Sequence, residues 1–491
     1  MLISNKSLRS RVLLILSSTL LYISSFSPLQ LSGQSEEVKV KIDAYLQQAM
    51  GRYNIPGLGV AVVTHDDIIY ENYMGLARLE GQVPVGQETL FRVYSTTKLI
   101  STVALFQLVE AGKISLEDPI SLYLADLPQK WQMVKIKNLL SHSSGLPDFI
   151  QFGSALSDDE LMAKLSEQNM EFRTGSQFRY NQTNYWLMAQ IIEKVSDTTF
   201  GRFVLQNQFG DVDNGVAFSS NASDTIVNRA TRYFFNNKSR KFEKDTNNNG
   251  RRGHAGNGLN ITLKRFIAWN RLLDNDVLLN EKTKSQMWTP FQFENEKDEF
   301  LHGWGIYRVN AAYSYGFSGG NLSAFRKFPQ HNTTIILLSN GYQLPVYDII
   351  VNDIARIAIP DIAAQEVTLE SDILETILDG QYASALADFE SAKKENPHSQ
   401  FDNLKWSINS IGNDYLYHQD DEERAFAVFK LNAEANGDWW LSMASLAEMY
   451  QLRQDTLKAI STYEKAISLN PTNEWNYNDQ MRNEIKKLAF Q

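Results

Sequence analysis

The pattern of apolar residues changes near residue 361, and this change constrains the fold more than any other feature. Before it, short apolar runs with strand character occur together with helical patterns. After it, strand patterns and glycine become scarce and helical periodicity dominates. We therefore predict a mixed α/β domain over residues 35–360 and an all-α domain over residues 361–491.

The strand patterns of the first domain predict an antiparallel sheet. Two apolar runs, Gly57–Thr64 and Ile68–Gly75, are separated by three polar residues, as in a β-hairpin. Such a meander differs from a parallel doubly wound sheet, and we expect helices to flank it. Further strands are expected at Tyr313–Phe317, Leu322–Phe328 and Thr333–Ser339, and helices at Lys39–Tyr53, Ser95–Ala111 and Asn184–Val195.

A small residue followed by an aromatic one recurs in the second domain. The pattern occurs at Ala385 and Phe389, at Ala425 and Phe429, and at Ala459 and Tyr463. The offsets of 40 and 34 residues bracket the period of a tetratricopeptide repeat. The region resembles a short array of such repeats, which would recruit a protein partner; a plain helical bundle is the alternative.

Composition excludes several classes of function. The chain of 491 residues has 57 acidic and 47 basic side chains and a formal charge of −10, which argues against a nucleic-acid partner. It has no cysteine, which excludes disulfides, thiolate metal sites and cysteine nucleophiles. No EF-hand or H-E-x-x-H spacing occurs, so we predict neither a metal site nor a cofactor.

Residues 1–34 have the pattern of a signal peptide. Lys6, Arg9 and Arg11 precede an apolar run, Val12–Ile23, that is shorter than a membrane span. An uncleaved anchor is the alternative. We expect a periplasmic or secreted protein with no membrane span after removal of the signal.

A serine and a lysine at helical spacing suggest a nucleophile and its base. Ser95 and Lys98 share a face at the start of an apolar helix. A desolvated lysine loses its proton more readily, and the helix N-terminus supplies free N–H groups. Ser391 and Lys394 have the same spacing, but they lie on a charged helix, which indicates a solvated face rather than a nucleophile site. Ser318, in a G-x-S-x-G pattern, is disfavoured because strand patterns flank it on both sides.

Several further motifs follow one another along the first domain. They are Phe91–Leu127 with Ser95 and Lys98, Leu139–Pro147, Tyr180, Ala255–Leu259 and Gly303–Gly305. In this order they resemble the serine β-lactamase-like family, which includes class C β-lactamases, D-alanyl-D-alanine carboxypeptidases, D-aminopeptidases and esterases. The helical region lies outside this resemblance.

The resemblance implies a role for each matching residue. Ser95 matches the nucleophile, Lys98 the lysine that assists its deprotonation, and Tyr180 the tyrosine that exchanges a proton with it. The backbone N–H groups of Ser95 and Gly320 would form the oxyanion hole. The residues expected to bind the substrate or the oxyanion are Gln182, Phe317, Ser318, Gly319 and Gly320.

Two positions depart from the family pattern. Gln182 replaces the usual asparagine. Phe317 replaces a lysine or histidine; this second change removes a cation from the pocket and favours an apolar acyl group, as in an esterase. We expect hydrolysis of an ester or amide, in a small molecule or peptide, through an acyl-enzyme. The alternative is a catalytically degenerate binding protein whose repeats recruit a partner. His142, in Ser-His-Ser-Ser-Gly, is expected to stabilise a loop rather than to catalyse.

Overall fold

The computed structural model describes residues 28–489 except for 65–66, 153, 211–214, 296–297, 364–368, 396–400, 472 and 475–476. Most of the predicted signal segment, residues 1–27, lies outside the described residues. The remainder of it opens α1 (Pro28–Arg52). Over the described ranges, no helix is both long and apolar enough to cross a bilayer.

The centre of the molecule is a seven-stranded sheet in the order β3-β2-β1-β12-β11-β10-β9, and its neighbouring strands run antiparallel. The antiparallel prediction is therefore confirmed. β1 pairs with β12, so the two ends of the first domain meet at mid-sheet. The strands are β1 (Gly57–Thr64), β2 (Ile68–Arg78), β3 (Val83–Pro84), β9 (Gly305–Val309), β10 (Ala312–Gly319), β11 (Ser323–Phe328) and β12 (Thr333–Ser339).

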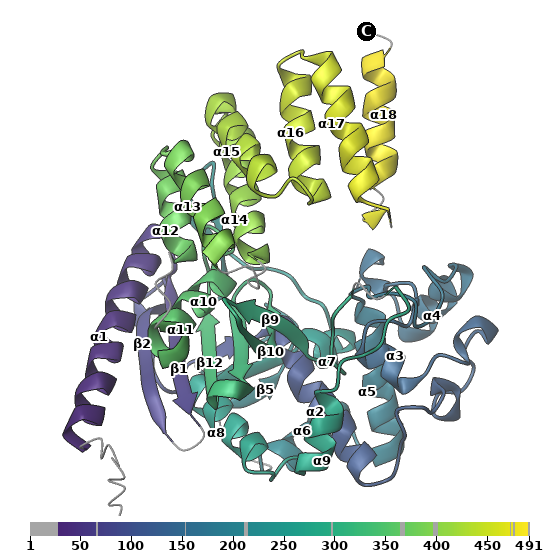
Figure 1. Ribbon diagram of the computed structural model, residues 1–491. Coiled ribbons are helices and arrows are strands. Elements are labelled where there is room, and N and C mark those ends of the chain that lie inside the picture. Colours follow the sequence, from purple (N-terminus) through teal and green to yellow (C-terminus); the bar gives the residue numbers. More distant parts are fainter. Residues whose placement is uncertain are drawn as a thin grey trace, which may run out of the picture.

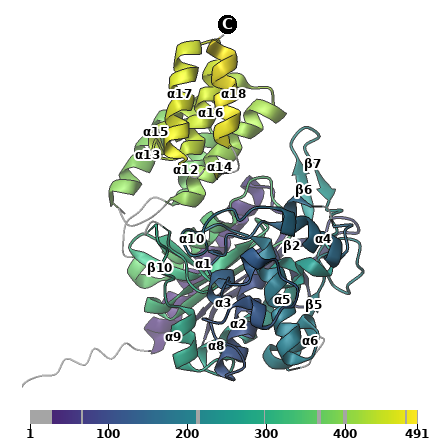
Figure 2. The same cartoon turned by 90° about the vertical axis from the view of Figure 1, so that its right-hand side faces the viewer.

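One face of this sheet packs against a layer of helices and short strands (Figure 1). The central helix α2 is apolar all round and is buried almost throughout its length, as expected for a core helix. The helices of this layer are α2 (Thr97–Glu110), α3 (Ile136–Leu140), α4 (Asp158–Glu167), α5 (Gln182–Ser196), α6 (Phe200–Gln208), α7 (His254–Asn257), α8 (Leu263–Asp274) and α9 (Glu281–Met287). The short strands are β4 (Leu90–Arg92), β5 (Val216–Phe218) and β8 (Leu259–Thr262), with a projecting hairpin of β6 (Tyr233–Asn236) and β7 (Lys241–Lys244) (Figure 2).

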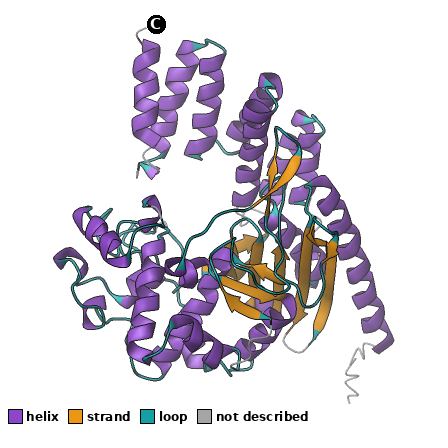
Figure 3. Ribbon diagram, turned by 180° about the vertical axis from the view of Figure 1, so that it is seen from behind, coloured by secondary structure: helices purple, strands orange, loops and turns teal. Residues whose placement is uncertain are grey.

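The other face of the sheet is covered by α1 and by α10 (Tyr347–Ala358), which continues into α11 (Pro360–Ala363). Seen from behind, the strands lie between the two helical layers (Figure 3). Because both faces are covered, β1 is apolar along nearly its whole length.

The C-terminal region consists entirely of helices in the part that the structure describes, so the all-α prediction is confirmed, whereas its tetratricopeptide character stays a prediction. The small and aromatic pairs lie on alternate helices, α13, α15 and α17. A Cβ at Gly412 would lie 2.5 Å from the Phe429 ring, which explains the small residue at that crossing. The helices are α12 (Glu370–Leu378), α13 (Tyr382–Glu395), α14 (Asp402–Asn413), α15 (Glu422–Ala435), α16 (Trp440–Leu452), α17 (Thr456–Leu469) and α18 (Tyr477–Ala489).

The apolar core continues across residue 361. The cluster behind the sheet includes side chains of α1, α10, helices α12 to α15 and Met449 of α16. The other buried apolar side chains of α16 to α18 form a second cluster together with Ala433 of α15. A buried ionic group reinforces this continuity: Asp353 of α10 accepts the backbone N–H groups of Glu370 and Ser371, and Arg356 pairs with both Asp353 and Glu370. The first helices of the tail are thus part of the packing of the sheet.

Candidate active site

A tight turn between β4 and α2 presents Ser95. The chain passes through a 3₁₀ turn, Tyr94–Thr96, in which Tyr94 has a left-handed backbone with φ of 46°. The end of β10 lies directly against this turn, since a Cβ on Gly319 would be 2.8 Å from the Ser95 nitrogen. The Ser95 side chain is partly exposed at the start of the buried helix α2.

Lys98 lies one helical turn further on and is fully buried. Its Nζ is 3.5 Å from Ser95 Oγ, 3.1 Å from Gln182 Oε1 and 3.0 Å from the carbonyl oxygen of Gly256. Burial lowers the pKa of Lys98 to about 7, although the nearby Asp148 carboxylate opposes part of the shift. A large fraction of the amine is therefore unprotonated near neutral pH.

Tyr180 completes the group that the sequence predicts. Its hydroxyl donates a hydrogen bond of 2.6 Å to Ser95 Oγ, and its ring packs against His142 and Phe317. Removal of the hydroxyl from bulk water raises the pKa of Tyr180, and its hydrogen bond to Ser95 offsets part of the rise. The phenol is consequently protonated near neutral pH and can donate a proton.

Gln182 brings its side-chain amide to Lys98, and its predicted contact with the substrate stays a prediction. It begins α5, and its Oε1 accepts hydrogen bonds from Lys98 Nζ and, at 3.3 Å, from Asn257 Nδ2. The extra methylene therefore does not separate this amide from the lysine.

Asn257 is a site residue to which the sequence assigned no role. Its Oδ1 accepts a 3.0 Å hydrogen bond from Ser95 Oγ, and it ends the short helix α7. The run Ala255–Leu259 carried part of the family resemblance, which was the available signal. The contact itself joins residues 162 positions apart, and no local pattern specifies it.

The structure places the β10 residues differently from one another. Phe317 faces Tyr180 and Phe300, and Gly319 and Gly320 pack against the Ser95 turn. Ser318, predicted to bind the substrate through this motif, points to the opposite face of the sheet, because successive strand residues alternate.

There the Ser318 hydroxyl donates to Asp348 Oδ1 at 2.6 Å and accepts from Arg326. The side-chain prediction for Ser318 is therefore wrong. The geometry is also unlike that of a nucleophile elbow, since Ser318 lies within β10 and β11 follows. Ser391 is exposed on α13 and donates to Glu395.

His142 lies behind Tyr180 and acts within the loop. Its Nδ1 accepts the backbone N–H of Asn181 at 3.1 Å, which places the ring proton on Nε2. Complete burial, together with the charge of Lys98, holds the pKa of His142 well below its ordinary value. A neutral imidazole then supports the chain just before α5, while Asp148 accepts the backbone N–H of Gln182.

Within the described ranges, no group of three or more histidine, aspartate or glutamate side chains is arranged to hold a metal ion. The site is instead a compact set of a hydroxyl, an amine, a phenol and two amides.

The family described as Beta-lactamase matches residues 42–358, well over half of the chain. The chain belongs to the Beta-lactamase family. The match begins within α1 and ends at α10, so helices α12 to α18 lie beyond it.

This member of the Beta-lactamase family is similar to proteins described as penicillin-binding proteins and to one described as an esterase. The putative penicillin-binding protein PbpX of Bacillus subtilis (strain 168) is 30% identical over 148 residues, which cover 30% of this chain and 37% of that protein. Esterase EstB of Burkholderia gladioli is 28% identical over 178 residues, covering 32% of this chain and 45% of the esterase. Both alignments thus span less than half of the relative. Penicillin-binding protein 4* of B. subtilis is 25% identical over 307 residues, 57% of this chain and 67% of that protein.

Solved structures show the same fold. A penicillin-binding protein homologue from Pyrococcus abyssi, described as octameric, superposes with a TM-score of 0.58 at 20% identity, over 68% of this chain and 81% of the homologue. D-amino acid amidase from Ochrobactrum anthropi SV3 gives a TM-score of 0.54 at 18% identity, over 63% of this chain and 92% of the amidase. At such identities the likeness concerns the fold alone.

Proposed function

We propose that this member of the Beta-lactamase family is a serine hydrolase that cleaves an ester or small amide through an acyl-enzyme on Ser95. The observation that carries the proposal is the position of a buried, readily deprotonated lysine and a protonated tyrosine on the same hydroxyl.

The contacts of Lys98 favour it as the base. A neutral amine has two N–H groups and one lone pair. The carbonyl oxygens of Gln182 and Gly256, which can only accept, are its two nearest partners and take both N–H groups. The lone pair is then left for Ser95 Oγ at 3.5 Å. In the observed geometry the Ser95 proton points to Asn257 Oδ1. Rotation of the hydroxyl turns this proton toward the Lys98 lone pair, which takes it when Ser95 attacks the substrate carbonyl.

Tyr180 suits the second proton transfer. Because its pKa is raised, it keeps its proton at neutral pH and can donate it to the leaving alcohol or amine. The backbone N–H groups of Ser95 and Gly320 are the proposed donors to the oxyanion, a contribution of typically about 3 kcal/mol per donor. Once the leaving group has departed, the proton on Lys98 passes to the Tyr180 oxygen and restores the phenol. Water then attacks the acyl-enzyme and gives a proton to Lys98. The bond between the acyl carbon and Ser95 Oγ breaks, and that proton returns to Ser95 as the carboxylic acid is released.

Phe317 directs the proposal toward apolar acyl groups. Its ring lies 6.1 Å from Tyr180 and 6.2 Å from Phe300, so this side of the site is aromatic. A carboxylate next to the scissile bond would have no cation at this position, whereas an uncharged acyl chain would bury apolar surface against the rings.

A hydrolysis panel tests this function. We expect p-nitrophenyl esters of short acyl chains to be cleaved faster than nitrocefin and D-amino-acid amides. Ser95→Ala should abolish the activity, while Ser391→Ala, a matched change at the other S-x-x-K serine, should leave it unchanged. Nitrocefin as the best substrate would contradict the preference for esters. No turnover of any substrate by folded protein would favour the binding-protein alternative.

A further inference from the structure

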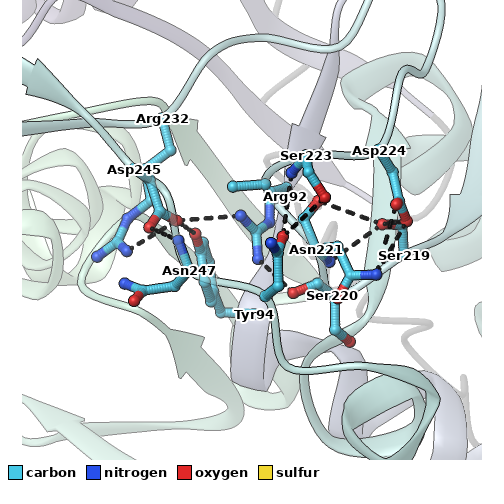
Figure 4. A network of polar contacts seen from close by, with 12 residues as sticks. Arg92, Tyr94, Ser219, Ser220, Asn221, Ser223, Asp224, Arg232, Asp245 and Asn247 are labelled. Atoms are coloured by element: carbon cyan, nitrogen blue, oxygen red, sulfur yellow. Dashed lines mark hydrogen bonds and ion pairs between the residues drawn. The ribbon is translucent and has the colours of Figure 1, made fainter. Parts of the chain in front are cut away.

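A polar cavity, separate from the Ser95 site, lies behind the turn that carries this serine. Its volume is about 240 Å³, and residues of β4 and of the chain from Ala222 to Arg232 line it. Figure 4 shows the polar contacts among Arg92, Arg232, Asp245 and their neighbours. Four arginines and two aspartates line the cavity: Arg78, Arg92, Arg229, Arg232, Asp224 and Asp245. The proposed hydrolysis does not use any of these side chains.

Asp245 balances only part of the positive charge. Its Oδ2 pairs with Arg92 at 3.1 Å and with Arg232 at 3.2 Å. Asp224, the other carboxylate, accepts from Ser219 and Asn221 instead. The four guanidinium groups therefore exceed the two carboxylates of the lining by two charges.

The other two arginines make no ion pair with the described residues. Arg229 is partly buried and donates only to backbone carbonyl oxygens, among them those of Asn221 and Ala222. Burial and the repulsion by Arg92 lower the pKa of Arg229, and the negative charges of Asp224 and Asp245 oppose only part of this shift. Arg78 lies exposed at the rim.

Two buried donors of this cluster lack an acceptor. The Arg92 side chain is only 5% exposed, and its Nε–H meets no hydrogen-bond acceptor among the described residues; the same holds for Arg232 Nε. A buried donor without a partner is costly, and an arginine can only donate. A negatively charged hydrogen-bond acceptor would pair with these N–H groups and balance the excess positive charge of the cavity.

We propose that this cavity binds a small oxyanion, a carboxylate or a phosphate group, held by Arg78, Arg92 and Arg229. The size admits a small anion and excludes a folded partner, and guanidinium groups suit planar and tetrahedral oxygen acceptors equally well.

The cavity is physically connected to the nucleophile turn. The guanidinium groups of Arg92 and Arg232 lie 4.7 and 4.9 Å from the centre of the Tyr94 ring, and the Tyr94 hydroxyl donates to Asp245. A bound anion would thus contact Arg92, one of the groups that hold the residue before Ser95.

Titration of the full-length chain tests the proposal. Thermal unfolding is followed with increasing inorganic phosphate or acetate, against chloride at equal ionic strength. We expect a saturable rise in Tm with phosphate, acetate or both, and their apparent Kd values decide between a phosphate and a carboxylate. Arg78→Gln and Arg229→Gln should each weaken binding roughly tenfold. Arg202→Gln, an exposed arginine of α6, is the matched control and should bind as the wild type.

Two results would overturn the proposal. One is a Tm response to phosphate and acetate no larger than that to chloride. The other is a saturable response that both cavity variants retain in full, which would indicate that the anion binds elsewhere. Because Arg78 is at the rim, its variant keeps the test informative even if Arg229→Gln misfolds.

Discussion

At the scale of single residues, the chemistry depends on the environment of one amine. Lys98 is surrounded by the rings of Tyr180 and Tyr185 and by two carbonyl oxygens, with no carboxylate in contact among the described residues. Burial without a counter-ion destabilises the charged form, which is the physical cause of its lowered pKa.

This environment predicts the pH dependence of the reaction. The unprotonated amine is the active form, so kcat/KM should rise with pH and level off above the Lys98 pKa of about 7. Well below that value, activity should fall roughly tenfold per pH unit. A pH–rate profile on a p-nitrophenyl ester measures this limb; a limb centred near the ordinary lysine value would contradict the assignment.

Substitution of Gly319 should lower activity through a change of geometry alone. A Cβ at this position would lie 2.0 Å from the Val93 carbonyl oxygen and 2.8 Å from the Ser95 nitrogen, so Gly319→Ala must push β10 away from the turn. A displacement of about 1 Å can cost about 100-fold in rate, and we expect a loss of that order. Gly86→Ala, where a Cβ meets nothing within 4 Å, is the control. Equal kcat/KM for both variants would refute this role of Gly319.

At the scale of elements, α10 fixes the position of β10 and β11 from behind. Ser318 and Arg326 both contact Asp348, and the Arg326–Asp348 ion pair is almost fully buried. The motif that suggested a substrate-binding serine therefore serves to attach the strand to its helix.

Removing this carboxylate should be strongly destabilising. Asp348→Ala leaves the Arg326 charge buried without its partner, which typically costs about 3–5 kcal/mol. Urea unfolding should show that loss, whereas Asp159→Ala, at an exposed position on α4, should change stability by less than about 1 kcal/mol. A loss as small as that of the control would show that α10 does not depend on this pair.

Much of the element pattern was predictable, since local periodicity specifies it. The strand Gly57–Thr64 and the strand Thr333–Ser339 have the predicted bounds. Both ends of α2 and of α5 lie within two residues of the helix ends predicted from the apolar patterns. The pairing of β1 with β12 and the contact of Asn257 with Ser95 were not predictable, because each joins distant segments. Strand alternation alone places the Ser318 side chain on the face opposite Phe317, whereas the family motif treats the whole run as lining the site.

At the scale of the whole molecule, the apolar core and the composition change do not coincide. Composition changes near residue 361, but the cluster behind the sheet continues through α15 and ends at Met449 of α16. Apart from Met449, the buried apolar side chains of α16 to α18 belong to a second cluster, and the groups that contact Ser95 come from elements outside these helices.

Two truncations distinguish the helices that share the core behind the sheet from the helices that do not. A chain that ends after Gly437 loses only α16 to α18 and should retain ester hydrolysis, with a modest fall in Tm. A chain that ends after Pro360 uncovers the apolar face of α10 and leaves Asp353 and Arg356 without Glu370, so it should aggregate or melt far lower. Equal thermal stability of the shorter chain and the full chain would contradict the shared core.

The central claim is that Ser95 is the acylated nucleophile, and a covalent probe tests it most directly. The full chain is incubated with a fluorophosphonate, and the modified residue is located by peptide mass spectrometry. We predict one adduct on Ser95 in the wild type and in Ser391→Ala, and none in Ser95→Ala. An adduct on Ser318 or Ser391, or labelling that persists in Ser95→Ala, would contradict the account.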